Sequence, residues 1–322
     1  MLKTKEDLVI AILLNYNQND YTIKCVKSLL ESDYNNLKIL LVDNGSSDEN
    51  YNELEQNISK DERVIFKRLV DNIGYAKGSN YGLEEGGKLD PTYFLILNND
   101  TVIDKMAVTE LVKTSKKYKD MARVTGKVYH YDEPEKLQFI AYKKIKNKKF
   151  SYIPIGVDQD DNGQFDSIKE LDMMDDIFVL HPASLFKSIG GYSPYLWVNG
   201  VNIDISLRAI NDGYKLVFSP NAKLWHKGSV SFGGRDMNPK LAFWNIQSKL
   251  ILRYLHSDKA TFVSSYFRIL INDVTRTLFK SVYLKLFKGE DITQYAMAKL
   301  KAYSYFNRWV FNKSNNTGYN PY

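Results

Sequence analysis

The chain has 322 residues, of which 44% are hydrophobic and 25% charged, a balance that is ordinary for a globular protein and excludes wholesale disorder. Its net charge of +6 is mild and its basic residues are spread along the chain, so nothing in the composition calls for a nucleic acid partner. The single cysteine, Cys25, excludes an intrachain disulfide and a zinc site made of cysteines alone, and it indicates a reducing compartment.

The amino-terminal residues hold one short apolar run, which leads directly into the first expected strand without the small-residue cleavage site of a signal peptide. No stretch reaches the roughly 20 apolar residues needed to span a bilayer. We therefore expect a soluble or peripheral protein, located in the cytoplasm or at the inner face of the membrane.

Three apolar runs in the first 105 residues have the composition of β-strands, and each ends abruptly in polar side chains. Segments with helical periodicity separate them, an alternation typical of an α/β protein with a mostly parallel sheet and flanking helices. The carboxyl ends of parallel strands meet at one edge, where open α/β folds bind ligands, so these polar residues are candidates for a binding site. They are Asn15 and Tyr16 after residues 8–14, Asp43 and Asn44 after residues 37–42, and Asn98, Asn99 and Asp100 after residues 94–97.

Two helices are expected around these strands. Residues 21–32 carry Ile23, Val26 and Leu29 at helical spacing, and Asp20 is a suitable amino-terminal cap. Residues 106–118 form the second predicted helix. Both are expected to pack on the sheet, with Cys25 in the core.

A second informative region, residues 188–231, is punctuated by glycines. Ile203, Leu207 and Ile210 fit a helix that ends at Gly213, and residues 215–218 fit a strand. The next apolar piece stops at His226. A histidine at a strand end is well placed to face the same cleft as Asp100.

Five ordered motifs, which together are far more specific than any one alone, carry a resemblance to a known family. They are LNYN at residues 14–17, VDNGSSD at 42–48, DNIGYAKGSNYG at 71–82, LNND at 97–100, and GGYSPYLWVNGVNIDISLRA at 190–209 continuing to His226. Over residues 8–230 the chain resembles a family 2 glycosyltransferase and is similar in particular to bacterial rhamnosyltransferase-like enzymes of polysaccharide assembly. The resemblance implies a GT-A fold, Rossmann-like with a mostly parallel sheet and flanking helices, as the catalytic domain over residues 1–235.

The resemblance further implies a UDP- or dTDP-sugar donor, because Asp43 would accept a hydrogen bond from the imide N–H of uracil or thymine. Tyr16 would stack near the nucleobase. Glycine in the third motif would let the backbone approach the ribose and diphosphate closely. The other implied donor-site residues are Leu14 from the first motif, Asn72, Gly74, Lys77 and Asn80 from the third, and Asn98 and Asn99 from the fourth.

A divalent cation is implied at the fourth motif. Asn98 and Asp100 take the first and last places of the family's DxD-like motif, whose last aspartate binds a metal that bridges the donor diphosphate; oxygen ligands suit Mg²⁺ or Mn²⁺. His226 matches the position that often completes the metal shell. The cation would neutralise charge on the leaving diphosphate while an acceptor hydroxyl, deprotonated by a carboxylate, attacks the anomeric carbon in line with inversion.

One departure from the family concerns the general base. Similar members carry aspartates where this chain has Asn199 and Asn202, and the residue matching Asn202 commonly deprotonates the acceptor hydroxyl, which an asparagine cannot do. Asp204 is the nearest retained carboxylate, and Asp175 or Asp176 are alternatives. The chain could also be a weakened homologue or an engineered variant.

Other interpretations stay open. Without the resemblance, Asp43 and Asp100 could cap the turns after their strands, and His226 could be an ordinary hydrogen-bonded residue. A nucleotide-sugar-binding protein that no longer catalyses would explain Asn202. A dinucleotide-dependent oxidoreductase would share the α/β alternation, but no GxGxxG follows the first strand.

The remaining residues, 236–322, are expected to form a helical carboxyl-terminal region. Residues 238–256 and 260–287 place apolar, aromatic and basic residues at helical spacing. Such helices could pack on the catalytic domain, make a homodimer contact, or lie on an anionic membrane near a lipid-linked acceptor. A growing surface polysaccharide, such as a capsule or cell-wall glycan, is the expected acceptor.

Between the two informative regions, a lysine-rich run at residues 143–149 precedes the acidic segment at residues 157–167. We expect a solvated hairpin or loop, because charge runs usually face water. The segment also resembles the start of a calcium loop, but no glutamate stands at the twelfth position from Asp158, which argues against an EF-hand.

Overall fold

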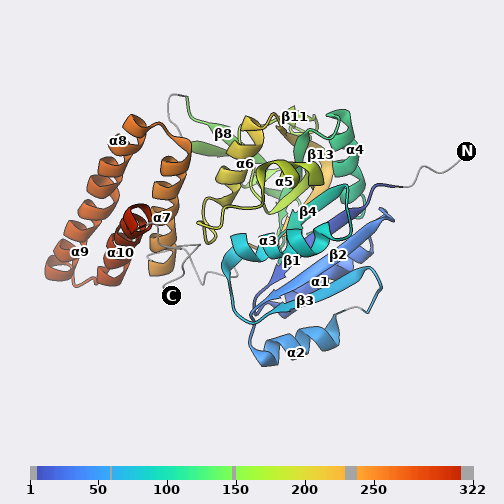
Figure 1. The fold of residues 1–322 in the computed structure, drawn as a ribbon, viewed down its shortest axis with the longest axis horizontal. Helices are drawn as coiled ribbons and strands as arrows, with labels where there is room; N and C mark the ends of the chain where they lie inside the picture. Colours follow the sequence, from blue (N-terminus) through green and yellow to red (C-terminus); the bar gives the residue numbers. More distant parts are fainter. Residues whose placement is uncertain (1–5, 59, 147–149, 229–237, 313–322) are drawn as a thin grey trace, which may run out of the picture. The chain divides into compact units, whose positions relative to one another are not determined.

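A computed structural model describes residues 6–58, 60–146, 150–228 and 238–312 of the chain (Figure 1). The chain divides into two compact units. The sheet unit comprises Met1–Tyr192 and Ile205–Gly228, and the helical unit comprises Ser193–Asp204 and Ser229–Tyr322. Residues 193–204 thus group with the carboxyl-terminal helices, and the division falls inside one helix, α6 (Val201–Asn211).

The centre of the sheet unit is a group of four parallel strands in the order β3-β2-β1-β4. The three strands expected from the apolar runs are confirmed as β1 (Val9–Asn15), β2 (Leu37–Asn44) and β4 (Tyr93–Leu97), and β3 (Val64–Leu69) joins them. Beyond β4 the sheet becomes mixed, because β12 (Phe178–Pro182) pairs antiparallel with β4 and β6 (Ala122–His130).

The remaining strands complete the unit. In the main sheet these are β5 (Thr101–Ile103), β7 (Lys136–Phe139), β10 (Gln159–Asp160), β11 (Lys169–Glu170) and β13 (Lys215–His226), while β8 (Ala141–Lys144) and β9 (Tyr152–Ile155) form a separate hairpin. The hairpin expected near the lysine run is therefore present in the described residues; the lysines at 147–149 lie outside them.

Strand β13 differs from the expectation of a four-residue strand followed by a separate piece. It is one strand of 12 residues, parallel to β6 and interrupted by a register shift between Phe218 and Lys223. Gly126 of β6 makes this shift possible, since a Cβ there would lie 2.1 Å from the carbonyl oxygen of Ala222. The bulge lets β13 continue to His226 and pair antiparallel with β5.

Helices cover the sheet. They are α1 (Asn19–Leu30), α2 (Asp48–Asn57), α3 (Gly74–Gly87), α4 (Ala107–Lys117) and α5 (Ala183–Ile189). The helix predicted for residues 106–118 is confirmed as α4. Helix α1 begins before the predicted residue 21: Gln18 and not Asp20 holds the cap position, and Asp20 lies in the first turn, where a negative charge favours the helix dipole.

Glycines at every fourth position let α3 lie close against β1. A Cβ at Gly82 would be 2.5 Å from Cγ2 of Ile12, and one at Gly86 would be 3.1 Å from Cγ2 of Ile10. Both isoleucines are fully buried, as are Val9, Ala11 and Leu13 on the other face of the strand. Strand β1 is thus buried on both faces, which explains its continuous apolar sequence.

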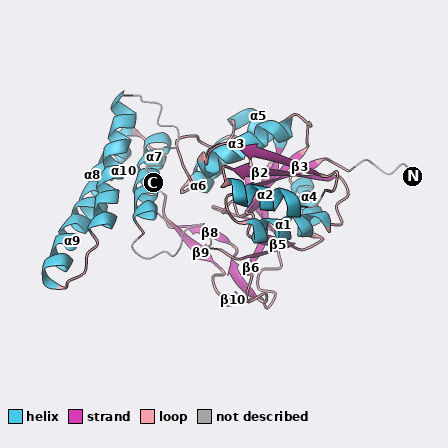
Figure 2. Ribbon diagram, turned by 90° about the horizontal axis from the view of Figure 1, so that it is seen from below, coloured by secondary structure: helices cyan, strands magenta, loops and turns pink. Residues whose placement is uncertain are grey.

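The helical unit confirms the two long helical segments expected after residue 237. It contains α7 (Pro239–His256), α8 (Lys259–Ile269), the π-helical η2 (Leu270–Thr275), α9 (Arg276–Phe287) and α10 (Thr293–Asn312). Figure 2 shows α8 and α9 joined end to end, with α10 alongside. Aromatic contacts hold the bundle, among them Tyr266 with Tyr303 at 4.6 Å between ring centroids. Within the described residues no helix has both the length and the apolar character needed to cross a membrane.

Candidate active site

The polar residues that follow β1, β2 and β4 lie at one edge of the sheet, as expected. Asn15 pairs in register with Asp43 across the parallel β1–β2 ladder, and Ile12 pairs with Ile96 on the other side. The residues immediately after Leu97 therefore stand beside the end of β1. This edge has three parts: the ends of β1 and β2, the start of α3, and the end of β4.

At the ends of β1 and β2, the Asp43 carboxylate is fully buried. Its Oδ2 accepts a hydrogen bond from Nδ2 of Asn15 at 3.0 Å, and its Oδ1 accepts from the backbone N–H of Ser46 at 3.0 Å. Asp43 thus caps the turn after β2, which is the structural role that the sequence allowed as an alternative to nucleotide binding. Its contact with a nucleobase stays a prediction, and the neighbouring Tyr16, 47% exposed, is the side chain at this edge that offers an open ring.

The loop after β2 approaches the loop before α3 so closely that only glycine fits at position 45. Gly45 has φ +79°, and a Cβ there would lie 2.3 Å from the carbonyl carbon of Asp71. Asn44, one of the strand-end candidates, joins the two loops: its Oδ1 accepts from the N–H of Ile73 at 3.2 Å, and its Nδ2 donates to Oδ1 of Asn72 at 3.3 Å. The predicted loop of Asn72 and Gly74 is therefore held in place by the VDNG motif.

The side chain of Asn80 has different partners from those expected. Its Nδ2 donates to the carbonyl oxygen of Tyr192 at 2.9 Å and its Oδ1 accepts from the N–H of Tyr192 at 2.7 Å. It clamps the GGYS motif, where a Cβ on Gly191 would lie 2.1 Å from the same Oδ1. Leu14 also has a packing role, beneath Gly78, whereas Lys77 is partly exposed in the first turn of α3. Binding of a nucleotide-sugar by Leu14 and Asn80 stays a prediction.

At the end of β4, Asp100 and His226 form a shielded pair. They are 9% and 7% exposed, and Oδ1 of Asp100 lies 3.2 Å from Nε2 of His226. The backbone N–H of Gly228 donates to the other carboxylate oxygen at 3.2 Å. The structure thus brings together the two residues that the sequence named as metal ligands, from segments 126 positions apart.

Gln138 on β7 orients the imidazole of His226. Its Oε1 lies 2.6 Å from Nδ1, and because this oxygen can only accept, Nδ1 carries the proton. In the neutral ring, Nε2 then presents its lone pair towards the Asp100 carboxylate, and it lies 3.3 Å from Nδ2 of Asn98. Sequence reasoning missed Gln138, which comes from a four-residue strand without a motif.

The arrangement of these atoms suits a divalent cation. A carboxylate oxygen and an unprotonated imidazole nitrogen are both electron-pair donors, and they face each other at 3.2 Å, where a shared cation satisfies both. No group of three or more His, Cys, Asp or Glu side chains in the described residues could hold a metal by itself. Mg²⁺ and Mn²⁺ commonly take further ligands from substrate phosphate oxygens.

The other asparagine of the LNND motif is turned towards α1. Nδ2 of Asn99 donates to Oγ1 of Thr22 at 2.8 Å, and this hydroxyl donates in turn to Oδ1 of Asn15 at 2.8 Å. A hydrogen-bonded chain therefore runs from Asp43 through Asn15 and Thr22 to Asn99. This chain fixes the relative positions of the three strand ends. The contact of Asn99 with a donor stays a prediction.

Two further carboxylates, Asp175 and Asp176, lie in the segment just before β12. Phe178 pairs with Leu97, and the N–H of Asn98 donates to the carbonyl oxygen of Ile177 at 3.0 Å, so the chain before β12 runs beside the LNND motif. Asp176 there accepts from Nη2 of the buried Arg123 at 2.5 Å. Asp175 is partly exposed and accepts from the Tyr142 hydroxyl at 3.1 Å; burial raises the pKa of its carboxyl, and the positive charge of a protonated His226 would oppose that shift.

The two residues predicted from the VNGVNID segment lie in the helical unit, in the first turn of α6. Asn202 is partly exposed. Asp204 is 1% exposed, and its Oδ1 lies 2.8 Å from Nε2 of His256 at the end of α7. Asp204 therefore links two helices of this unit, and its use as a base stays a prediction.

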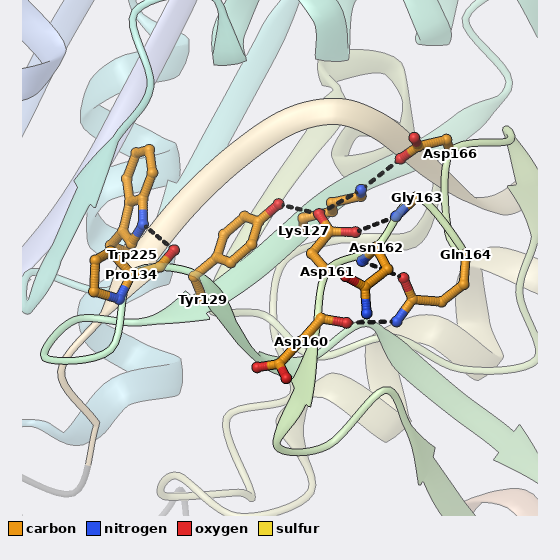
Figure 3. A network of polar contacts seen from close by, with 10 residues as sticks. All are labelled: Lys127, Tyr129, Pro134, Asp160, Asp161, Asn162, Gly163, Gln164, Asp166 and Trp225. Atoms are coloured by element: carbon orange, nitrogen blue, oxygen red, sulfur yellow. Dashed lines mark hydrogen bonds and ion pairs between the residues drawn. The ribbon is translucent and has the colours of Figure 1, made fainter.

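The acidic segment after residue 156 forms a network around a buried lysine (Figure 3). Nζ of Lys127 donates to Asp161 at 2.7 Å and to Asp166 at 2.6 Å, and the hydroxyl of Tyr129 also donates to Asp161, at 2.5 Å. The ammonium group, only 3% exposed, provides the positive charge that these carboxylates need. The network thus agrees with the sequence argument against a calcium loop.

Comparisons with known proteins agree with this geometry. Residues 10–166 match the sequence model described as "Glycosyl transferase family 2". Glycosyltransferase GlyG of Streptococcus pneumoniae is 27% identical over 129 residues, 40% of this chain and 42% of GlyG. Poly-beta-1,6-N-acetyl-D-glucosamine synthase of Staphylococcus epidermidis is 24% identical over 226 residues, 69% of this chain and 50% of the synthase. The chain thus spans half or less of the length of these relatives.

Solved structures show the same fold. A mannosyltransferase of Pyrobaculum calidifontis, solved with GDP-Man and Mn²⁺, superposes with a TM-score of 0.55 at 11% identity, covering 97% of this chain and 89% of that one. GalNAc-T7, solved with UDP, GalNAc and Mn²⁺, superposes with a TM-score of 0.56 at 12% identity, covering 95% of this chain and 57% of that one. The fold is GT-A, and the match to glycosyltransferase family 2 covers residues 10–166, just under half of the chain.

Proposed function

We propose that the sheet unit binds a UDP- or dTDP-sugar together with Mn²⁺ or Mg²⁺ and transfers the sugar, with inversion, to a hydroxyl of a growing surface polysaccharide. The observation that carries this proposal is the Asp100–His226 pair, two electron-pair donors held 3.2 Å apart at the end of β4. The Mn²⁺ named with both structural neighbours supports it, as does the polysaccharide synthase among the relatives. A capsule or cell-wall glycan, lipid-linked at the inner face of the membrane, is the acceptor that fits this proposal.

The protein's own part in the reaction begins with the pair and its support. When bound, the divalent cation neutralises charge on the departing nucleotide diphosphate. Asp100 and His226 would hold it at the end of β4, and Gln138, by accepting a hydrogen bond from the Nδ1–H of His226, would leave Nε2 as the ligand atom. The low exposure of the pair keeps water away, so its electrostatic interactions are stronger than they would be at the surface.

Two further features suit a nucleotide diphosphate. Helix α3 begins at Gly74, and the amino terminus of a helix favours anions through its unpaired N–H groups and its dipole. Lys77 in its first turn adds positive charge. After β1, the exposed ring of Tyr16 offers a stacking surface for a base. Asp43 at the end of β2 would read the pyrimidine imide after a local rearrangement, since its carboxylate is fully buried.

For the base that deprotonates the acceptor, Asp175 is better placed than Asp204. Asp204 is buried and engaged with His256, whereas Asp175 is partly exposed and lies just before β12, in the segment that runs beside the LNND motif. A raised carboxyl pKa also makes Asp175 a stronger proton acceptor. We therefore propose Asp175 as the base in place of the aspartate that Asn202 replaces.

Asn202 favours a second candidate function, a nucleotide-sugar-binding protein without turnover. Loss of a general base typically lowers a rate by about 10² to 10⁴ without abolishing donor binding. The two candidates share the donor site and differ in turnover alone. Restoring the carboxylate with Asn202→Asp separates them, because a large gain in turnover means that no other carboxylate serves as an efficient base.

Thermal unfolding with UDP, dTDP, GDP or NAD, each with Mn²⁺ and with a chelator, tests the donor site. A ligand present at about 100 times its dissociation constant adds about 2.7 kcal/mol of stability, a shift of several degrees. We expect a shift with UDP or dTDP that disappears with the chelator and in Asp100→Asn or His226→Gln. His130→Gln is the matched control, because His130 pairs in register with His226 on β6 but bonds Asp158 instead. A metal-independent shift, or one with NAD alone, contradicts the proposal.

A further inference from the structure

A stripe of exposed apolar side chains runs along α9 of the helical unit. Phe279, Val282, Tyr283, Leu286 and Phe287 follow the spacing i, i+3, i+4, i+7 and i+8, which places them on one face of the helix. Phe279, Leu286 and Phe287 are each more than 70% exposed. Single apolar residues are common on surfaces, but a contiguous set of this kind marks an interaction surface. We call these five residues the α9 stripe.

An apolar groove lies beside the stripe, between α9 and α10. Its volume is about 420 Å³, which is within the range of small-ligand pockets. Phe279, Val282 and Leu286 of the stripe line it from α9, and Ala296 and Met297 line it from α10. The groove can therefore take up a hydrocarbon chain in contact with the stripe.

Basic residues border the stripe on both sides. At 100° per residue, Lys280 lies about 100° from Phe279 around the helix, and Lys285 lies about 120° away in the other direction. Arg276 and Lys288 add two more positive charges, and residues 276–288 contain no Asp or Glu. Lys285 is paired with Asp291 at 2.9 Å, but both side chains are more than half exposed, so the pair is well solvated.

We propose that the α9 stripe and its groove dock on the surface of an anionic lipid bilayer. The apolar side chains enter the boundary between head groups and acyl chains, a lipid chain occupies the groove, and the flanking lysines lie at the phosphates. A second copy of the chain is a poorer occupant, because stripe against stripe brings the basic borders of both copies together with no acidic residue on either α9. The helix lies on the membrane and does not span it.

This docking goes beyond donor binding and does not depend on it. If the proposed function holds, the contact would keep the enzyme at the surface where a lipid-linked acceptor is located. A failure of the nucleotide experiment would leave the docking untouched, and a failure of docking would leave the donor site untouched. The two proposals are thus tested separately.

Flotation of the full chain with vesicles tests the proposal. We expect binding to phosphatidylcholine vesicles that contain phosphatidylglycerol, little binding to pure phosphatidylcholine, and loss of binding in high salt, because the attraction is screened. Phe279→Ser with Leu286→Ser should lower the partition coefficient at least about tenfold, since two large side chains leave the apolar contact. Lys280→Gln with Lys288→Gln should lower it about fivefold per charge removed.

Matched controls use residues of similar exposure in the sheet unit. Val70→Ser with Ile153→Ser removes two exposed apolar side chains, and Lys113→Gln with Lys187→Gln removes two exposed charges; neither pair should change binding. Unchanged thermal unfolding and circular dichroism of each variant verify folding. No flotation at low salt overturns the proposal, as does equal binding to neutral vesicles. A dimer that Phe279→Ser with Leu286→Ser converts to monomer, without flotation, would assign the stripe to a second copy instead.

Discussion

Replacing Gln138 with leucine should weaken metal binding without touching a metal ligand. The substitution keeps a side chain of similar size and removes the acceptor that lies 2.6 Å from Nδ1 of His226. The imidazole then loses the partner that fixes both its tautomer and its ring orientation. Residues that support a metal-binding histidine in this way typically contribute 10- to 100-fold to affinity, which corresponds to about 1.4 to 2.7 kcal/mol.

The assay is a titration of Mn²⁺ in the presence of saturating UDP, followed by the electron paramagnetic resonance signal of free Mn²⁺. We expect a dissociation constant for Mn²⁺ that is 10- to 100-fold higher in Gln138→Leu than in the natural chain. Gln164→Leu is the control: its amide bonds the backbone oxygen of Asp160 and the N–H of Asn162, in a loop away from His226. Equal affinities in the natural chain and Gln138→Leu would refute the argument that Gln138 sets the tautomer.

Three further predictions concern packing, catalysis and reactivity. Gly82→Ala should lower the free energy of unfolding by about 1–3 kcal/mol because its Cβ would lie 2.5 Å from buried Ile12, whereas Gly87→Ala, with nothing within 4 Å, should be neutral or slightly stabilising in urea denaturation. Asp175→Asn should lower turnover about 10² to 10⁴-fold while UDP binding stays within error. In the unsubstituted chain, activity should fall as the pH drops through the raised pKa of the Asp175 carboxyl. Retained turnover in Asp175→Asn would exclude Asp175 as the base. Burial raises the pKa of the Cys25 thiol to about 12, so we expect alkylation by iodoacetamide at neutral pH after unfolding only; rapid labelling of the native chain would contradict its buried position.

The central strands and the closeness of Asp100 to His226 could be predicted because their signals are local. Each parallel strand is a short apolar run that ends in a polar residue, and both Asp100 and His226 stand at such an end. The order of the five motifs along the chain then assigned Asp100 and His226 to one site. The same reasoning placed α4 within one residue at each end, because its apolar periodicity is regular.

Other features depend on partners that are distant in the sequence. Gln138 acquires its role from His226, 88 positions away, and Asn80 is fixed by Tyr192, 112 positions away. The antiparallel insertion of β12 beside β4, which brings Asp175 near the LNND motif, likewise follows from tertiary pairing and leaves no mark in the local pattern. Glycine periodicity in α3 was visible in the sequence, but its cause, the close approach to Ile12, required the structure.

Anomalous diffraction at the manganese edge, from crystals grown with UDP and Mn²⁺, tests the central claim most directly. We expect a single strong peak about 2 Å from both Oδ1 of Asp100 and Nε2 of His226, with diphosphate oxygens completing the coordination shell. A peak at another place on the chain, or bound UDP with no manganese at this pair, would contradict the assignment of Asp100 and His226 as the metal ligands of the donor site.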